Sequence, residues 1–374
     1  MKLKTVLLSS AAAFAVAGGA QAADLSVAEP VEYVKACEAF GAGYFYLPGS
    51  DTCLQITGNV EFDANFFSNG IVYGNVGTTF VPAVSIHSAS WDFVTTGGVY
   101  FDAKSMTDVG VLEANVGFKG TYNGAGGNSV ALDGAYLKLG GLKAGHFGST
   151  FNPGASYVDD YGIANEIKSS LADSNHLELS FKASTVGFAL GIEDPRESFG
   201  SALPDSYSLP LITGNVTFGG TSWAGFLSAG YTQINSTTNN SGSSWGIDGE
   251  LTFDIGSMDH LRINGAYGDN PFIGGGSYAS TPAPAPSFGS NNGWSAFASF
   301  QHLFSNTFRT DWDFSYIQYA GTSSQSLQNR YAIGADLVWL PYAGFKAKLG
   351  VTYGKANNAS TGAWAAQVAL KRSW

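Results

Sequence analysis

The residues best suited to chemistry are too scattered to form a catalytic or metal site. The five histidines are His87, His146, His176, His260 and His302. No two of them form a His-x-x-x-His pair, and no cysteine lies beside them. Ser174-Asn175-His176 has the residue types of a hydrolase site, but adjacent side chains on a strand point apart. The glycine-rich stretch 124–127 lacks the strand, lysine and helix of a phosphate-binding loop. We therefore expect no enzyme activity, no metal site and no cofactor.

The first residues have the pattern of an export signal. Lys2 and Lys4 precede a short apolar run at 6–17, and Ala-Gln-Ala at 20–22 is a small-x-small cleavage pattern. The apolar run is shorter than the ~20 residues of a spanning helix, which argues against an uncleaved anchor. We expect residues 1–22 to be a signal peptide.

An exported protein would carry its two cysteines as a disulfide. Cys37 and Cys53 are the only cysteines, and they would enter an oxidising compartment, where a disulfide closing this short Gly- and Pro-containing loop is stable. A zinc site would need further ligands of suitable spacing nearby. We predict a leader at 23–53 tied by this disulfide, followed by the main domain at 54–374.

From Leu54 onward, apolar and polar residues alternate. In 345–353, the apolar Phe345, Ala347, Leu349, Val351 and Tyr353 alternate with Lys346, Lys348, Gly350 and Thr352. The segments 245–255 and 331–339 show the same period. Alternation indicates strands with one apolar and one polar face, which fits a soluble sandwich as well as a membrane barrel.

Strand length favours the barrel. We predict about sixteen strands, most of which reach the ~9–11 residues of a tilted transmembrane strand, whereas soluble strands average ~5–6. They lie at 54–67, 88–104, 108–122, 129–139, 141–150, 176–184, 185–194, 208–219, 222–234, 244–255, 259–268, 293–304, 306–319, 327–340, 343–355 and 361–374.

The connections between these strands also favour the barrel. Tight turns at 140–141, 184–185, 220–221 and 341–342 alternate with long links, and outer-membrane barrels sort their connections in this way. The long links lie at 68–87, 150–175, 194–207, 233–243 and 269–292. Most tryptophans fall near strand ends, as expected of interfacial girdles. These are Trp91, Trp223, Trp245, Trp294, Trp339, Trp364 and Trp374, whereas Trp312 lies in mid-strand.

Composition agrees with this fold class. Charged residues are only 13%, glycine reaches 49 residues, and the net charge is -11 without basic runs, which argues against a nucleic-acid surface. A membrane-spanning sheet must pair all its backbone groups by closing on itself. We predict an all-β, closed antiparallel transmembrane barrel, too wide for its side chains to fill.

Several segments also resemble a known family. Residues 33–37 (YVKAC), 41–49 (GAGYFYLPG) and 53–58 (CLQITG) are similar to the N-terminal signature of alphaproteobacterial, rhizobial and Brucella-type general porins. Residues 143–149 (KAGHFGS) resemble the strand before the constriction loop of that family. The resemblance implies a sixteen-stranded outer-membrane barrel, a homotrimer, and a third loop that folds inward.

Two residues depart from the family pattern. The family usually ends in Phe, whereas this chain ends in Trp374, although apolar residues at spacing two still precede it, as in the signal for barrel assembly. His146 stands where the family resemblance implies an arginine, and an unperturbed histidine is mostly neutral at pH 7.

In a channel of this kind, bore and lining charge determine what passes. The candidate constriction loop at 150–175 carries Asp159, Asp160, Glu166 and Asp173; these form an acidic rim or merely solvate an exposed loop. A basic wall opposite would create a transverse field. Its candidate lumen-facing residues are His146, Lys119, Arg262, Arg309, Arg330, Lys346 and Lys348. The alternative is a polar lumen whose basic residues simply pair with nearby aspartates.

We therefore predict a general diffusion porin in the outer membrane of a Gram-negative bacterium. Its partners would be outer-membrane lipid, lipopolysaccharide, small hydrophilic solutes and ions. One alternative is a substrate-selective channel, in which Tyr100, Tyr122 and Tyr136 could line the lumen. The other is a plugged barrel whose surface loops bind a partner.

Overall fold

The computed structural model describes most of the chain downstream of the leader's first residues. The described residues are 35–68, 70–71, 74–76, 79–81, 86–87, 90–123, 127–153, 171–199, 207–234, 242–273, 292–319, 328–356 and 362–374. None of the helices in these ranges has the length and apolar character needed to cross a membrane. The expected signal peptide at 1–22 lies outside them.

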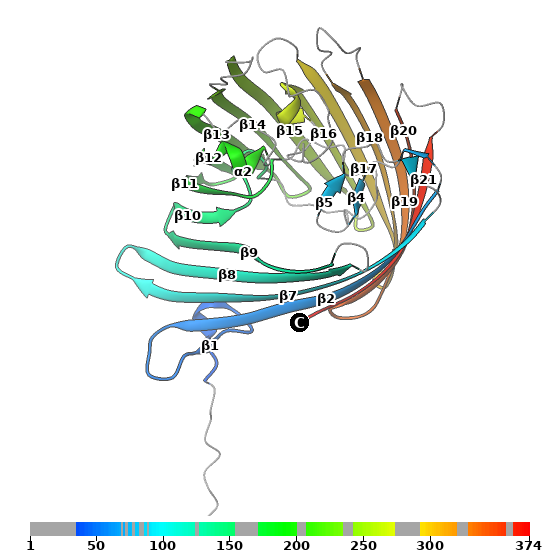
Figure 1. Cartoon of the computed structure of the whole chain (residues 1–374). Coiled ribbons are helices and arrows are strands. Elements are labelled where there is room, and N and C mark those ends of the chain that lie inside the picture. Colours follow the sequence, from blue (N-terminus) through cyan, green and yellow to red (C-terminus); the bar gives the residue numbers. More distant parts are fainter. Residues whose placement is uncertain are drawn as a thin grey trace, which may run out of the picture.

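Sixteen antiparallel strands form a closed ring (Figure 1), which confirms the predicted barrel. In ring order the strands are β2 (Cys53–Phe67), β7 (Ser90–Thr107), β8 (Gly110–Asn123), β9 (Gly127–Leu139), β10 (Leu142–Phe147), β11 (Ser174–Ala183), β12 (Val186–Glu193), β13 (Tyr207–Gly219), β14 (Trp223–Ile234), β15 (Gly242–Ile255), β16 (Asp259–Gly268), β17 (Gly293–Ser305), β18 (Phe308–Tyr319), β19 (Gln328–Tyr342), β20 (Phe345–Ala356) and β21 (Ala363–Ser373). Each strand pairs with the next, and β21 pairs with β2, with Ser373 opposite Asn59. Closure gives every strand of the ring a neighbour on both sides, and the pairing of β9 with β10 covers residues 135–139 of β9.

A few short elements complete the described fold. The leader contains η1 (Glu38–Phe40) and β1 (Phe45–Tyr46), and β1 pairs with the start of β2. The link after β2 contains β3 (Gly70–Ile71), β4 (Gly74–Val76), β5 (Thr79–Val81) and β6 (Ile86–His87). Two one-turn helices, α2 (Pro195–Ser198) and α3 (Asn270–Ile273), follow β12 and β16.

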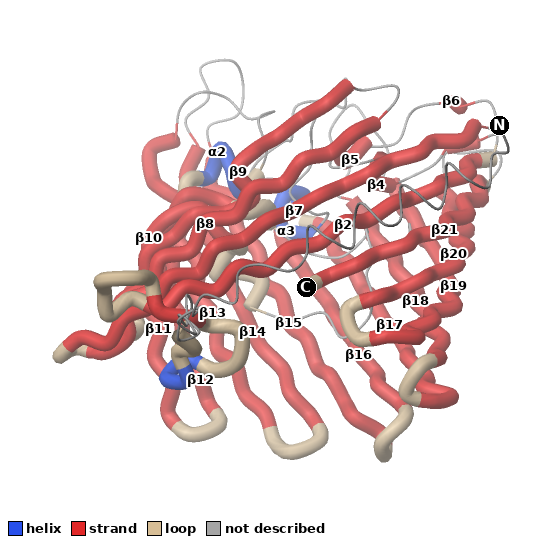
Figure 2. The backbone as a smooth tube through the Cα atoms, turned by 90° about the horizontal axis from the view of Figure 1, so that it is seen from below, coloured by secondary structure: helices blue, strands red, loops and turns tan. Residues whose placement is uncertain are grey.

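Each predicted strand corresponds to one strand of the ring. The clearest difference is at β10, which ends at Phe147 rather than near residue 150, because the following residues leave the sheet and pack against the lumen wall. Short turns join alternate strand pairs along one rim, where they are drawn in tan in Figure 2.

The alternation of side chains separates two environments. On β15 and β16, Ile247 and Ile263 are exposed on the outer face, whereas Asp248, Glu250 and Arg262 are buried on the inner face. The exposed tryptophans Trp91, Trp294 and Trp339 lie on the outer face, and mid-strand Trp312 lies there too. An apolar exterior around a polar interior is the pattern of a barrel whose outside meets hydrocarbon.

The wall is not equally tall around the ring. β10, β11 and β12 contain 6, 10 and 8 residues, whereas β7 contains 18. The β10–β12 segment, which we call the short wall, therefore presents a lower apolar band than the rest of the barrel.

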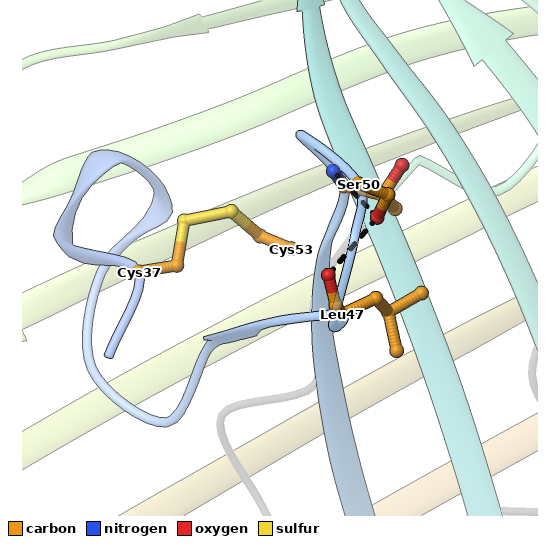
Figure 3. Close-up of a disulfide and its surroundings, with 5 residues drawn as sticks. Cys37, Leu47, Ser50 and Cys53 are labelled. Atoms are coloured by element: carbon orange, nitrogen blue, oxygen red, sulfur yellow. Dashed lines mark hydrogen bonds between the residues drawn. A yellow bond between two sulfur atoms is a disulfide. The ribbon is translucent and has the colours of Figure 1, made fainter. Parts of the chain in front are cut away.

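The predicted disulfide between Cys37 and Cys53 is confirmed (Figure 3). Both cysteines are buried with Tyr44. The Cys37 N–H donates to the Tyr44 carbonyl at 2.8 Å. The Tyr44 hydroxyl donates to the Asp102 carboxylate on β7 at 3.0 Å. The leader is thus fastened to the inner face of β7 near the short-turn rim.

The C-terminal residue closes the seam between β21 and β2. The Trp374 N–H donates to the Gly58 carbonyl at 3.0 Å, and the Gly58 N–H donates back to Trp374 at 3.1 Å. A Cβ atom on Gly58 would lie 2.5 Å from the Trp374 indole ring. The ring packs directly over this glycine, so any side chain there would displace it.

We therefore expect Gly58→Val to reduce the yield of folded barrel, measured as the heat-modifiable band in semi-native electrophoresis. Overpacking of this kind costs about 1–3 kcal/mol. Gly97→Val is the matched control, since a Cβ on Gly97, in neighbouring β7, would come no closer than 3.9 Å to another atom. Equal yields for the two variants would show that the seam does not depend on this contact.

Candidate functional site

The late strands carry a buried, neutralised polar network on their lumen face. The Arg262 Nη2 lies 2.7 Å from the Glu250 Oε2, and the two side chains are 6% and 3% exposed. The Lys348 Nζ lies 3.7 Å from the Asp336 Oδ2. Arg262 and Lys348, two of the expected basic residues, therefore lie on the expected face but are paired and covered.

The other predicted basic residues lie in different settings. The Arg309 Nε donates to Asp311, which is fully buried, at 3.3 Å. Lys346 is half-buried, and the side chain of Arg330 lies outside the described residues. Lys119 is more open, at 38% exposure, and lies 4.0 Å from Asp133 on β9.

His146 does not share the face of the lumen residues. It pairs with Ala135 on β9 and Asn175 on β11, whereas the lumen-facing Lys143 precedes it by three positions and so has the opposite parity. Its Nδ1 lies 3.5 Å from the Glu197 carboxylate, which also accepts from the Asn175 side chain. The register thus places His146 beside α2 and the start of β11.

The link that follows β10 turns into the barrel at once. The Asn215 amide of β13 donates to the Thr150 carbonyl at 2.6 Å, and the Thr150 hydroxyl donates to Glu178 of β11 at 2.8 Å. The Asn152 amide reaches Asp248 of β15 at 3.4 Å. These partners are lumen-facing, so the first residues of the link run along the inner wall.

Glu193, at the end of β12, is the centre of this anchorage. The Ser149 hydroxyl and the Thr150 N–H, both from the link, donate to one carboxylate oxygen at 2.9 and 3.0 Å. The hydroxyl groups of Ser174, Ser198 and Thr213 also donate to the carboxylate, at 3.2, 3.1 and 2.5 Å. Glu193 is 1% exposed; several charge-assisted hydrogen bonds offset the cost of burying its charge.

An apolar cluster fastens the same region. It consists of Phe151, Leu171, Phe199, Leu211 and Phe272, all buried. The Phe272 ring lies 5.2 Å from both the Phe151 ring and the Phe199 ring. Its members come from both ends of the link at 148–173, from the residue after α2, from β13 and from α3. Three connections that are remote in sequence are therefore locked together inside the ring.

Two glycines make room for this cluster. A Cβ on Gly230 would lie 2.5 Å from the Phe272 ring, and one on Gly246 would lie 2.3 Å from the Phe272 Cβ. Just before α3, Asp269 accepts from the Trp245 N–H at 3.2 Å, and burial raises the pKa of its carboxyl group. These contacts hold the start of the link at 269–292 against the wall.

The early strands carry charges that are more open to solvent. The Tyr136 hydroxyl donates to Glu113 at 2.8 Å, and the Tyr100 hydroxyl donates to Asp133 at 2.6 Å. The Lys104 Nζ lies 3.2 Å from Asp102. Of the three tyrosines considered as lumen lining, Tyr122 is 59% exposed and lies on the outer face, because it has the opposite parity to Lys119 on β8. Lys119 and Asp133, on β8 and β9, are thus more open than the buried ion pairs of the late strands.

Most of the predicted acidic rim lies outside the described residues. This applies to Asp159, Asp160 and Glu166. Asp173, just before β11, is exposed, with a carboxylate oxygen 3.8 Å from where a Cβ on Gly148 would stand. It therefore lies where the two ends of the link meet.

Sequence reasoning missed Glu193, Asp133 and the lysines of β9 and β10. Parity could have identified the lysines, because Lys138 and Lys143 are placed symmetrically about the Gly140-Gly141 turn. No sequence signal marks Glu193 as the common partner of five donors, since those donors come together only when the ring closes.

Glu193→Ala should release the link while leaving the ring closed. Lost hydrogen bonds and unpaired buried donors cost about 1–3 kcal/mol each. We expect larger open-channel current fluctuations in planar bilayers, with Glu193→Gln intermediate.

Glu250→Ala is the matched control. Glu250 is likewise buried on the lumen face, but its carboxylate pairs with Arg262 of the neighbouring strand β16, away from the link. It should lower the thermal stability without raising the fluctuations. Equal fluctuations in both alanine variants would contradict an anchoring role for Glu193.

A family model described as a porin subfamily matches residues 24–373. Outer membrane protein IIIA of Rhizobium leguminosarum bv. viciae is 35% identical over 198 residues, which cover 52% of this chain and 49% of that protein. Porin Omp2b of Brucella suis is 35% identical over 174 residues, covering 43% of this chain and 45% of that protein. The aligned part of the chain spans about half the length of these relatives.

Solved structures with little sequence identity share the fold. The outer membrane channel DcaP of Acinetobacter baumannii has a TM-score of 0.70 at 13% identity, covering 88% of this chain and 99% of that one. The anion-selective porin of Comamonas acidovorans has a TM-score of 0.59 at 8% identity, covering 86% and 100%. The trimer form of OmpT from Vibrio cholerae has a TM-score of 0.56 at 10% identity, covering 87% and 100%.

Proposed function

The chain belongs to the porin subfamily, and on that basis we propose that it forms a passive, water-filled channel for small hydrophilic solutes and ions in the outer membrane of a Gram-negative bacterium. The observation that carries the proposal is a closed ring of sixteen strands with an apolar outer face and a charged inner face. A ring of this size is too wide for wall side chains alone to fill.

We place the open passage to one side of the lumen, next to the early strands. Mid-strand residues on the inner faces of β15, β18 and β20 are buried, as Asp248, Asp311 and Lys348 illustrate. On β8 and β9, Lys119 and Asp133 keep 38% and 33% of their side-chain surface exposed. Solutes would therefore pass along the early strands, beside the inward-folded link.

The constriction would then lie between this link and the early strands. The candidates for its acidic rim remain Asp159, Asp160, Glu166 and Asp173. Among the basic residues predicted to face the lumen, Lys119 is a candidate for the opposite side because its side chain is 38% exposed. Arg262, Arg309 and Lys348 would contribute little to the electric field in the bore, because each is paired with a carboxylate that cancels most of its charge.

Conductance in a planar bilayer tests the channel. We expect stepwise, ohmic increments when the purified protein is added, because a water-filled bore carries current in proportion to voltage. A barrel without steps, confirmed as folded by heat modifiability, would be a plugged structural barrel. Saturation of the flux by one solute would indicate a substrate-selective channel.

We also propose that the channel is a homotrimer whose subunits meet at the short wall. Strands of 6 and 8 residues are shorter than the ~9–11 that a tilted transmembrane strand needs. Leu179, Phe181 and Leu190 are exposed on this wall. Contact with other copies would cover an apolar band that lipid alone matches poorly. Outside the contact, lipid and lipopolysaccharide would surround the barrel.

Single cysteines test this arrangement. Leu179→Cys on β11 should cross-link to higher oligomers with a short bismaleimide in outer-membrane vesicles. Ile333→Cys on β19, across the ring in Figure 1, has similar exposure, 51% against 60%, and should remain monomeric. Cys37 and Cys53 are held in their disulfide and do not interfere. Cross-linking at residue 333 alone would place the contact at β19, across the ring from the short wall.

A further inference from the structure

Two lysines face each other across the β9–β10 hairpin. The Gly140-Gly141 turn joins the strands, with Leu139 opposite Leu142 and Lys138 opposite Lys143. Leu137 and Leu142 are exposed on the outer face, so the lysines, which have the opposite parity, project into the lumen. The pair therefore lies at the short-turn mouth of the channel.

The carboxylates that flank this pair in register are engaged elsewhere. Glu113 stands opposite Lys138 on β8, and Glu178 stands opposite Lys143 on β11. Glu113 accepts from the Tyr136 hydroxyl at 2.8 Å and lies 3.7 Å from Lys104. Glu178 accepts from the Thr150 hydroxyl at 2.8 Å. Within the described part of the chain, neither lysine has a carboxylate oxygen within 4.0 Å.

This setting contrasts with that of other lumen-facing bases. Lys104, Lys119, Arg262, Arg309, Lys348 and Lys371 each lie within 4.0 Å of a carboxylate. Like charges directly opposite each other in a sheet are destabilising. Because neither ammonium group is held in a direct ion pair, both can donate hydrogen bonds to an anion arriving from the bore.

Aromatic rings hold one of the two ammonium groups in place. The Lys143 Nζ lies 4.0 Å from the centroid of the Tyr136 ring and 3.7 Å from that of the Phe147 ring. Gly145 stands opposite Tyr136 on the same face and contributes no side chain that would block this position. The rings attract the ammonium group but leave its net charge in place.

We propose that Lys138 and Lys143 form an oxyanion-binding subsite at the short-turn mouth of the lumen. A carboxylate or phosphate of a solute in transit would accept hydrogen bonds from both ammonium groups, and the edges of Tyr136 and Phe147 would contact its apolar part. Because both lysines face the lumen, lipid headgroups do not reach them. This subsite rests on the proposed channel function and adds weak binding of oxyanions as a class, not selection of one solute, to simple diffusion.

The test uses the full-length protein reconstituted in planar bilayers. Inorganic phosphate or citrate is added on the short-turn side in a background of KCl, and the concentration that halves the KCl current is measured. For the double variant Lys138→Gln/Lys143→Gln we expect that concentration to rise at least about tenfold, a 1.4 kcal/mol loss of binding. The phosphate and citrate arms show which oxyanion the subsite prefers.

Lys371→Gln is the matched control, since it removes one lumen charge that already lies 3.1 Å from the Glu61 carboxylate. It should change the half-blocking concentration by less than about twofold. An equal rise in this control, or no rise in the double variant, would overturn the subsite. Isothermal titration of phosphate or citrate into the detergent-solubilised protein gives a second readout of binding, independent of conduction. A wild-type protein that binds the anion but carries no current would refute the channel and leave the subsite standing.

Discussion

Complete pairing of backbone hydrogen-bonding groups is the constraint on which the structure depends. A sheet in hydrocarbon finds no water to satisfy its edges, so the first and last strands must pair with each other. That pairing occurs between β2 and β21, where Asn59 stands opposite Ser373. Trp374 extends it by exchanging two backbone hydrogen bonds with Gly58. Strand alternation then assigns every side chain to one of two environments. Hydrophobic side chains such as Ile247 and Leu251 face outward, and the charges they alternate with face inward.

Closure alone would leave a wide, symmetrical hole, and the inward connections change it. Glu193 and the Phe151–Phe272 cluster collect segments that follow β10, β12 and β16 onto one side of the interior. A buried charge and an apolar cluster act together there: the carboxylate orients the hydroxyl groups of the link, and the rings exclude water around it. The result is a lumen in which one side is packed like a protein core and the other side keeps half-exposed charges.

This asymmetry bears on selectivity. Counting lumen-facing bases would overstate the field in the bore, because pairs such as Arg262–Glu250 are desolvated and mutually neutralised. The net effect on a solute depends on the charges that lie outside direct ion pairs, such as Lys138 and Lys143 in the described part of the chain. The overall charge of -11 is therefore a poor guide to what such a channel admits.

The sequence by itself determined the fold class, the strands and the disulfide. Alternation in segments such as 345–353 is a local consequence of strand geometry, and the two cysteines have no other partner to choose. It also assigned Arg262 and Lys348 to the inner face, because parity depends only on counting along a strand. Only the tertiary structure decided that these two bases are buried in ion pairs, that β10 ends at Phe147, and that Glu193 accepts from five donors in four separate segments. Burial and hydrogen bonding depend on which strands and links meet across the closed ring, and sequence periodicity carries no information about contacts between segments far apart in the chain.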